Sequence, residues 1–379
     1  MESFKKYTTV FILLFINFIF TYKYTIRITN LAGLLSLGLL TLQIAVYIFQ
    51  EKKTISKSNL KKGFLAIGVL WFLLVLITHY KIALESLNVD RWSVISSFIE
   101  ECLKGNYPYY AKSHSGSVPG PMPFYFLLAS PFYFIGELAL FSYIGYAVIT
   151  VLLVKRSDNM KHANFMLFYL LTSVYVLWEL VVRSNIFTNA ALILLAFIYL
   201  EDFDFRYSWK FWLMAFLTGF MLSTRSVFIL PYTIFFLSYL LNKKVKFSKL
   251  VQFLLLAVAG FSLTFLPLVT FFKEDFLKIN PFIVESTFLI PMGYTVFFIV
   301  LALGLSFLVK SSEDRFFYSG LSLFLSILIY SIYHLVKVGF QAAYIDSLID
   351  ISYFILCVPF LIYYLSGAKS VSAAKISKS

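Results

Sequence analysis

The chain has 379 residues, of which 60% are hydrophobic and only 13% are charged. Because soluble globular proteins carry about 25% charged residues, this composition excludes an ordinary soluble enzyme and predicts an integral membrane protein. The formal net charge of +13 does not indicate a nucleic-acid partner, since the basic residues lie between apolar runs and form no single patch. The two cysteines, Cys102 and Cys357, are too far apart to predict a metal motif or a disulfide framework.

Apolar segments follow one another along the whole chain, and a transmembrane helix needs roughly 17–25 such residues. The segments lie at residues 6–22, 31–49, 63–80, 122–154, 163–182, 186–200, 209–224, 226–241, 250–272, 289–309, 316–337 and 347–366. The first one lacks the small-x-small cleavage site of a signal peptide, so we expect it to remain as a helix. The prediction is an all-α, polytopic transmembrane bundle of about 12 helices, with 11–13 allowed because residues 122–154 could cross once or twice.

The Lys and Arg residues are unevenly shared between the hydrophilic joints. With a cytoplasmic N-terminus and a single crossing by residues 122–154, one side receives 21 of the 32 Lys and Arg residues and the other side 11. The richer side is cytoplasmic by the positive-inside rule. Residues 50–62 and 242–249 are therefore expected in the cytoplasm, and residues 81–121 outside.

The longest polar interruption runs from Lys81 to Pro123, after the third apolar segment. Long loops in compact proteins are usually functional or disordered. Apolar residues in the first half of this loop recur at the i, i+3, i+4 spacing of an amphipathic helix; they are Trp92, Ile95, Phe98, Ile99 and Leu103. We expect a helix from about Arg91 to Lys104, lying flat on the outer face of the bundle.

Three charged residues are the main candidates for chemistry. Asp90, a carboxylate at the membrane boundary, could act as a general base on a hydroxyl group; the alternative is that its side chain caps the helix that follows. Arg183 and Arg225 each stand in a short joint between two apolar segments, where a guanidinium could bind a phosphate group with two hydrogen bonds. The alternative for both arginines is contact with ordinary lipid headgroups.

Four further residues of the long loop are candidates for a substrate pocket, namely Arg91, Tyr107, Tyr109 and His114. Interfacial tyrosines also serve as simple membrane anchors, so this alternative stays open for Tyr107 and Tyr109. The chain contains no Gly-rich phosphate loop, HExxH, CxxC or GxSxG motif, and soluble nucleotide, zinc and serine-hydrolase chemistry have no support.

The order of several motifs resembles a known class of membrane enzymes. After Asp90 come Gly105-Asn106-Tyr107-Pro108-Tyr109-Tyr110 and the helix start Pro121-Met122-Pro123, followed by Val182-Arg183-Ser184-Asn185 and by Gly219 to Arg225 with Pro231 beyond. This order is similar to the GT-C class of polytopic glycosyltransferases, and most similar to the polyprenyl-phosphate-mannose-dependent mannosyltransferases, including the catalytic subunit of the first GPI mannosyltransferase. The likeness covers roughly residues 60–245. The chain departs from the family pattern at two positions, because Asn88 replaces the first of two acids and Ser184 replaces a glycine.

The resemblance implies an inverting hexosyltransferase that takes mannose or another hexose from a polyprenyl-phosphate donor. Asp90 would deprotonate the acceptor, a glycan or glycolipid, and Arg225 with Arg183 would bind the donor phosphate. The resemblance also divides the chain into three parts, namely two N-terminal helices with a basic loop (1–62), a catalytic module (63–245) and C-terminal helices (246–379). The resemblance makes no cofactor certain: it leaves room for a divalent cation, but the paired-acid motif is incomplete here, and no metal ligands are assigned.

Composition also bears on location and on rival functions. The chain is rich in Phe, Ile and Lys and poor in Cys, and it ends without a retention signal. We therefore expect a multi-pass protein of a bacterial inner membrane, with its active site facing the periplasm.

The alternative functions are a polysaccharide polymerase or ligase, a lipid-linked glycan transporter, and a membrane scaffold without enzymatic activity. A transporter would favour internal repeats and charges halfway along broken helices, and the sequence has neither.

Overall fold

A computed structural model describes residues 2–50, 55–87, 89–157, 160, 162–206, 208–288, 291–346 and 349–367, in which every regular element is a helix. The α-helices are α1 (Glu2–Thr25), α2 (Ala32–Phe49), α3 (Lys57–Lys81), α4 (Arg91–Leu103), α5 (Pro123–Ile135), α6 (Ala139–Arg156), α7 (Ala163–Leu171), α8 (Val174–Val181), α9 (Ile186–Glu201), α10 (Trp209–Leu222), α11 (Ile229–Leu241), α12 (Phe247–Phe271), α13 (Lys273–Lys278), α14 (Pro281–Phe288), α15 (Met292–Phe307), α16 (Ser312–Phe340) and α17 (Val358–Leu365). Short 3₁₀ turns occur at η2 (Leu84–Ser86), η3 (Pro108–Tyr110), η5 (Ser226–Phe228) and η7 (Ile351–Cys357), and η6 (Gln341–Ile345) is a π-helical turn.

The described helices are those of a membrane protein, although fewer of them reach full spanning length than the sequence predicts. Six are long and apolar enough to cross a bilayer, and α7 with α8 makes a seventh if the pair, bent by 42°, counts as one span. The other apolar helices have 10–17 residues. All twelve predicted segments contain helix, but twelve crossings are not confirmed.

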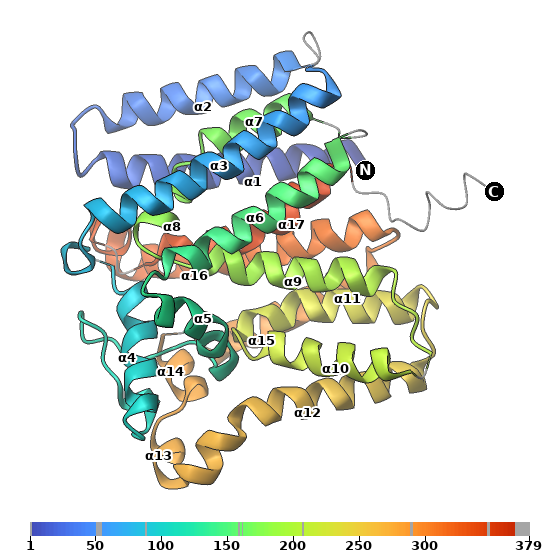
Figure 1. Cartoon of the computed structure of the whole chain (residues 1–379). Helices are drawn as coiled ribbons and strands as arrows, with labels where there is room; N and C mark the ends of the chain where they lie inside the picture. The colour runs from blue at the N-terminus through green and yellow to red at the C-terminus, as the bar shows by residue number, and fades with distance from the viewer. Residues whose placement is uncertain are drawn as a thin grey trace.

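The helix termini gather at two opposite ends of the bundle (Figure 1). At one end lie the N-terminus and the joints between α2 and α3, α6 and α7, α9 and α10, and α11 and α12. At the other end lie α4, α13 and α14. The first group contains the joints between α2 and α3 and between α11 and α12, which are predicted to be cytoplasmic, and the second contains α4, which belongs to the loop predicted to be outside. We call them the basic end and the α4 end.

The polypeptide between the long loop and α6 does not form two crossings. Helix α5 has 13 residues, which rise about 20 Å, whereas the hydrocarbon core of a bilayer is about 30 Å thick. Both of its ends also lie at the α4 end, because Met122 donates its backbone N–H to Thr224 and Glu137, just beyond α5, contacts His79 and Arg183. Only α6 therefore runs along the bundle, which agrees with the single crossing assumed for residues 122–154.

The helices approach closely where glycines face a neighbour. A Cβ atom added to Gly219 of α10 would lie 1.9 Å from the carbonyl oxygen of Ala257 in α12, and one added to Gly260 would lie 2.8 Å from the carbonyl oxygen of Phe216. Small residues allow this approach in membrane helices, where association depends on packing rather than on the hydrophobic effect. Helices α10 and α12 therefore form a tight pair, and α10 leads directly to Arg225.

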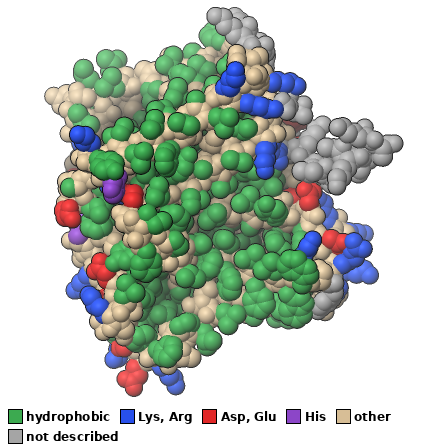
Figure 2. Space-filling view, viewed as in Figure 1, with side chains coloured by type: hydrophobic (Ala, Val, Ile, Leu, Met, Phe, Trp, Pro, Cys, Tyr) green, Lys and Arg blue, Asp and Glu red, His purple; other side chains and the backbone are tan. Residues whose placement is uncertain are grey.

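Apolar side chains cover the surface between the two ends (Figure 2). Figure 2 shows hydrophobic groups over the middle of this face, with the charged groups gathered toward both ends. The exposed groups include Leu34 and Leu37 of α2, Val69 of α3, and Leu255 and Val258 of α12. An exposed apolar area of this extent is stable in contact with lipid and not with water.

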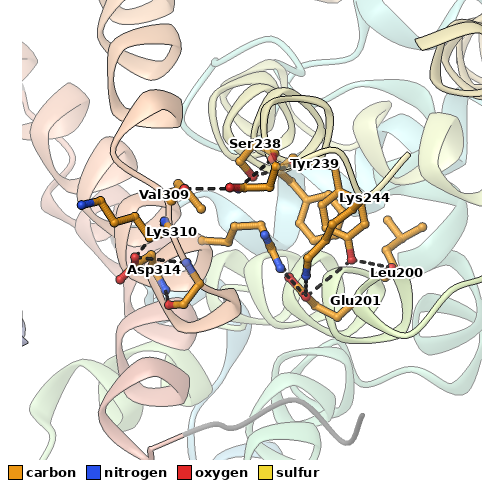
Figure 3. A network of polar contacts seen from close by, with 12 residues as sticks. Leu200, Glu201, Ser238, Tyr239, Lys244, Val309, Lys310 and Asp314 are labelled. Atoms are coloured by element: carbon orange, nitrogen blue, oxygen red, sulfur yellow. Dashed lines mark hydrogen bonds and ion pairs between the residues drawn. The ribbon is translucent and has the colours of Figure 1, made fainter. Parts of the chain in front are cut away.

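Buried ion pairs join the helices at the basic end. Arg315, at the start of α16, donates from Nε and Nη2 to both carboxylate oxygens of Glu201, and both side chains are almost wholly buried. Lys244 lies 3.8 Å from the same carboxylate, and the Tyr239 hydroxyl donates to the carbonyl of Leu200 at 3.0 Å (Figure 3). These contacts hold the ends of α9, α11 and α16 together.

Candidate functional site

Asp90 lies at the N-cap position of α4, but its side chain does not cap the helix. Its Oδ2 atom accepts hydrogen bonds from the hydroxyls of Ser113 at 3.0 Å and Ser115 at 2.7 Å. Burial by itself would raise the pKa of this carboxyl, but hydrogen bonds from Ser115, Ser117 and Ser113, together with the Arg91 charge, lower it below its usual value. The capping alternative is therefore wrong, and Asp90 is an ionised carboxylate at neutral pH.

Arg91, the first residue of α4, connects the long loop to the C-terminal part of the chain. Its Nη2 atom forms an ion pair with Asp350 and donates to the Ser352 hydroxyl at 3.3 Å. Its guanidinium lies 5.4 Å from the centre of the Tyr353 ring. Its Nε atom is buried without a hydrogen-bond acceptor among the described residues. A residue that the sequence placed in a substrate pocket is thus held by the segment that precedes α17.

Arg225 is buried between α10 and η5, with 7% of its surface exposed. Its guanidinium lies 5.2 Å from the ring centre of Tyr125 and 5.6 Å from that of Tyr353. Within the described residues, neither Nε nor Nη2 has a hydrogen-bond acceptor. The headgroup alternative does not fit this arginine, because its side chain is enclosed by protein and by two aromatic rings.

The neighbours of Arg225 are held by the backbone and by a second polar contact. The N–H groups of Met122 and Phe124 donate to the carbonyls of Thr224 and Ser223, at 3.2 and 3.1 Å, which fixes the start of α5 beside Arg225. The Tyr125 hydroxyl donates to Oδ1 of Asn185 at 2.6 Å, and this contact fixes the Tyr125 ring beside the Arg225 guanidinium. The start of α5 is thus a support for Arg225.

These residues form what we call the two-arginine site: Arg91, Arg225, Tyr125, Asn185 and Tyr353. They come from α4, α5, the joints after α8 and α10, and η7. Both guanidinium groups lie near the Tyr353 ring, and three of their nitrogen atoms are buried without an acceptor. Buried N–H groups without an acceptor are costly, so the site is suited to bind an anion that accepts several hydrogen bonds. A phosphate group has this chemistry, and guanidinium groups match its geometry.

Arg183 differs from Arg225 because its guanidinium is bound by groups of the protein itself. Its guanidinium donates to the backbone carbonyls of Val181, Thr78 and Ile82 at 2.9–3.2 Å and lies 3.4 Å from the Glu137 carboxylate. Its backbone has a φ of 54°, in the left-handed region that non-glycine residues seldom adopt. These contacts give Arg183 a structural role, and we do not carry forward its predicted role in phosphate binding.

A buried carboxylate explains why the turn around Arg183 is stable. Glu179 of α8 is fully buried and accepts hydrogen bonds from the Ser184 hydroxyl at 3.0 Å, the Phe187 backbone N–H at 3.2 Å and the Tyr146 hydroxyl at 2.7 Å. Two of these donors lie on either side of Asn185. Glu179 therefore fixes the turn that presents Asn185 to the two-arginine site.

Tyr107 and Tyr109 are buried supports of the long loop. Both rings are buried, and their hydroxyls donate to the backbone carbonyls of Ile279 at 2.6 Å and Pro121 at 2.9 Å. Burial raises the pKa of Tyr107, which therefore stays protonated as a donor. The two tyrosines join the loop to the segment between α13 and α14 and to the start of α5.

His114 remains on the surface close to Asp90. Its ring stacks on Trp92, with ring centres 5.5 Å apart and planes inclined by 16°. Its Nδ1 lies 2.7 Å from the Ser93 hydroxyl and its Nε2 lies 3.1 Å from the carbonyl oxygen of Leu87. The stacked pair stands beside the serine residues that bind Asp90, so this polar surface is a suitable place for a hydroxyl-bearing molecule.

Several residues of the site were not found from the sequence. Tyr125, Asp350 and Tyr353 lie in apolar surroundings, and nothing in their spacing marks them out; Asn185 belongs to the quoted motif around Arg183 but was given no role of its own. Ser113 and Ser115 carried a weak signal, because they flank a polar histidine in an otherwise apolar chain. Asn88, where the family pattern has its other acid, lies outside the described residues. Among those residues, no group of three or more His, Cys, Asp and Glu side chains could hold a metal ion.

Comparisons of the chain with protein-family models, with curated proteins and with solved structures gave no match. What the structure defines is therefore a class: an all-helical chain with apolar helices of membrane-spanning length and a buried two-arginine site at one end. The further assignment depends on the chemistry of that site.

Proposed function

We propose that this protein is a membrane glycosyltransferase that moves a hexose from a polyprenyl-phosphate donor to a hydroxyl of a glycan or glycolipid. The observation that carries the proposal is Arg225, whose buried guanidinium keeps two nitrogen atoms without an acceptor among the described residues. A lipid phosphate would supply the missing acceptor oxygens. Its hydrocarbon tail would lie in the bilayer beside the apolar helices.

In this mechanism Asp90 is the general base. The acceptor oxygen attacks the anomeric carbon of the donor sugar while its proton passes to the Asp90 carboxylate, on which Ser113 and Ser115 both donate to Oδ2. The bond between the anomeric carbon and the phosphate oxygen breaks, and the phosphate leaves with the electron pair. Attack from the side opposite the phosphate inverts the configuration at that carbon.

Arg225 supports the departure of the phosphate in this proposal. The oxygen that leaves the sugar gains negative charge, and a guanidinium already in place stabilises that charge without reorganisation. The aromatic rings of Tyr125 and Tyr353 exclude water on two sides of the guanidinium, which strengthens its attraction for the anion. No nucleotide site is needed, because the donor already carries the activated bond.

The acceptor would approach Asp90 from the surface formed by Ser113, Ser115 and the stacked pair of Trp92 and His114. Aromatic rings bind the apolar faces of sugars, and serine hydroxyls exchange hydrogen bonds with sugar hydroxyls. By the positive-inside rule we place the α4 end outside, facing the periplasm of a bacterial inner membrane.

The proposal is tested by sugar transfer in proteoliposomes that contain the full chain, a radiolabelled polyprenyl-phosphate hexose and a mixture of glycolipid acceptors. Asp90→Asn keeps the shape of the side chain but removes its basicity, so transfer should fall by about 10²–10⁴-fold while the donor is still bound. Arg225→Ala should weaken donor binding and turnover together, and Arg225→Lys should restore only part of both, because a point charge replaces a planar fork.

Matched variants at the basic end provide the controls. Asp204 and Arg206 are exposed and form an ion pair with each other, so Asp204→Asn and Arg206→Ala should leave transfer unchanged. Full transfer by Asp90→Asn would refute the assignment of the base. Movement of labelled lipid across the bilayer without any transfer would favour the transporter alternative.

A further inference from the structure

Asp350 brings a carboxylate to the two-arginine site from a part of the chain to which the family resemblance assigns no role. Its Oδ1 atom accepts a hydrogen bond from the backbone N–H of Ser352 at 2.9 Å, which caps η7. Its Oδ2 atom forms the ion pair with Arg91. Because each oxygen has its own partner, the carboxylate is held in place from two directions.

The charges of the site are therefore balanced in a particular way. Arg91 has two acids as neighbours, Asp350 in direct contact and Asp90 next to it in the sequence. Among the described residues, Arg225 has no ion pair with an acid. The site with its two flanking acids thus carries two positive and two negative charges, and Arg225 is the guanidinium that no described acid neutralises. This arrangement accommodates one added negative charge well and a second one poorly, since the second would face the Asp350 carboxylate.

The proposed donor and product differ in this respect. A sugar joined to a lipid through phosphate is a phosphodiester with one negative charge. Transfer of the sugar leaves a phosphomonoester, which carries close to two negative charges above its second pKa of about 6. A site that discriminates by charge would bind the donor and release the product.

We infer that Asp350 determines this specificity: its fixed carboxylate makes the two-arginine site prefer a singly charged lipid phosphodiester to a doubly charged lipid phosphomonoester. The inference rests on the proposed function, because it concerns the phosphate of the same donor. It assigns Asp350 no contact with the reacting atoms. Its effect is electrostatic, because the carboxylate beside Arg91 repels a second negative charge on the bound phosphate.

The test measures how the purified full chain in lipid nanodiscs binds two probes at pH 8, farnesyl phosphate and its methyl ester, by calorimetry. The wild-type protein should bind the methyl ester more tightly. In Asp350→Asn the affinity for farnesyl phosphate should rise about tenfold relative to that for the ester, a modest factor because 35% of the Asp350 side chain is exposed and water screens its charge. The ratio of the two affinities cancels any general loss of folded protein.

Two further variants isolate the charge from the structure. Asp350→Glu keeps the charge and should keep the preference for the ester. Asp346 is exposed in the same segment, so Asp346→Asn removes a charge outside the site and should also leave the preference intact. An unchanged affinity ratio in Asp350→Asn, with both probes still bound, would overturn the role of Asp350 and leave the phosphate site standing. If the wild-type protein bound neither probe, the proposed function would fail, and this inference with it.

Discussion

Gly219 is the residue whose replacement tests most directly how the fold supports Arg225. The sequence places it in a motif that ends at Arg225, whereas the structure shows that it packs against α12. An alanine Cβ would lie 1.9 Å from the carbonyl oxygen of Ala257, and ordinary contacts begin near 3.4 Å. Helices α10 and α12 would have to separate by about 1.5 Å, the difference between these two distances.

The expected loss of stability follows from two opposing effects. Overpacking of this kind costs about 3 kcal/mol or more, because the clashing atom is backbone and cannot rotate away. The better helix propensity of alanine offsets about 1 kcal/mol of that cost. A net loss of about 2 kcal/mol should lower Tm by roughly 5 °C in a thermal unfolding assay of the detergent-solubilised protein.

A second glycine provides the matched control. Gly304 lies within α15, and a Cβ atom added there would meet no other atom within 4 Å, so Gly304→Ala should leave Tm unchanged or raise it slightly. Because α10 ends three residues before Arg225, Gly219→Ala should also weaken binding of a lipid phosphate. The packing argument is refuted if Gly219→Ala is as stable as Gly304→Ala.

Three other predictions concern charge and orientation. The lowered pKa of Asp90 keeps its carboxylate ionised above about pH 4. A pH series should therefore show no loss of transfer due to protonation of Asp90 between pH 7 and pH 5. The stability that the hydrogen bonds to this carboxylate contribute is lost only as the pH falls through the lowered pKa. A midpoint near pH 6 that disappears in Asp90→Asn would contradict this expectation. Arg315→Ala leaves Glu201 buried without its main partner and should destabilise the protein by about 3–5 kcal/mol in a thermal assay, whereas Arg206→Ala should cost little. The orientation is tested by single cysteines in a protein whose native cysteines have been replaced. A cysteine at the exposed Lys112 should react with an impermeant label added outside intact cells, and one at the exposed Lys57 should not. The reverse pattern would invert the proposed orientation.

The sequence alone predicts the class of fold well, because apolar length and charge asymmetry are local properties. The segment predicted to be helical between Arg91 and Lys104 is α4, and the apolar stripe of that segment is buried at Ile95, Phe98 and Ile99. Spanning length is less predictable, since the break between α7 and α8 contains no proline or glycine; side chains of other helices, Asn17 of α1 and Gln43 of α2, form hydrogen bonds with Thr172 there.

The candidate site was found only in part, for a physical reason. Asp90, Arg91 and Arg225 stand out in the sequence because charge is rare near the ends of apolar segments. Tyr125 and Tyr353 do not stand out among 26 tyrosines, and only the packing of η7 and α5 against the arginines selects them. Arg183 is equally conspicuous in the sequence, but its guanidinium donates to carbonyl groups that no pattern could place beside it.

The contact between Arg91 and the segment around Ser352 joins residues that are 261 positions apart. During synthesis on the ribosome, Arg91 leaves the exit tunnel long before its partners Asp350 and Ser352 exist. The nascent chain must therefore hold α4 at the membrane surface without its ion pair while the later helices insert. Activity is expected to begin only when residues 349–353 have been made and α17 is in place. A chain that ends before that point should insert its first helices and yet have no two-arginine site.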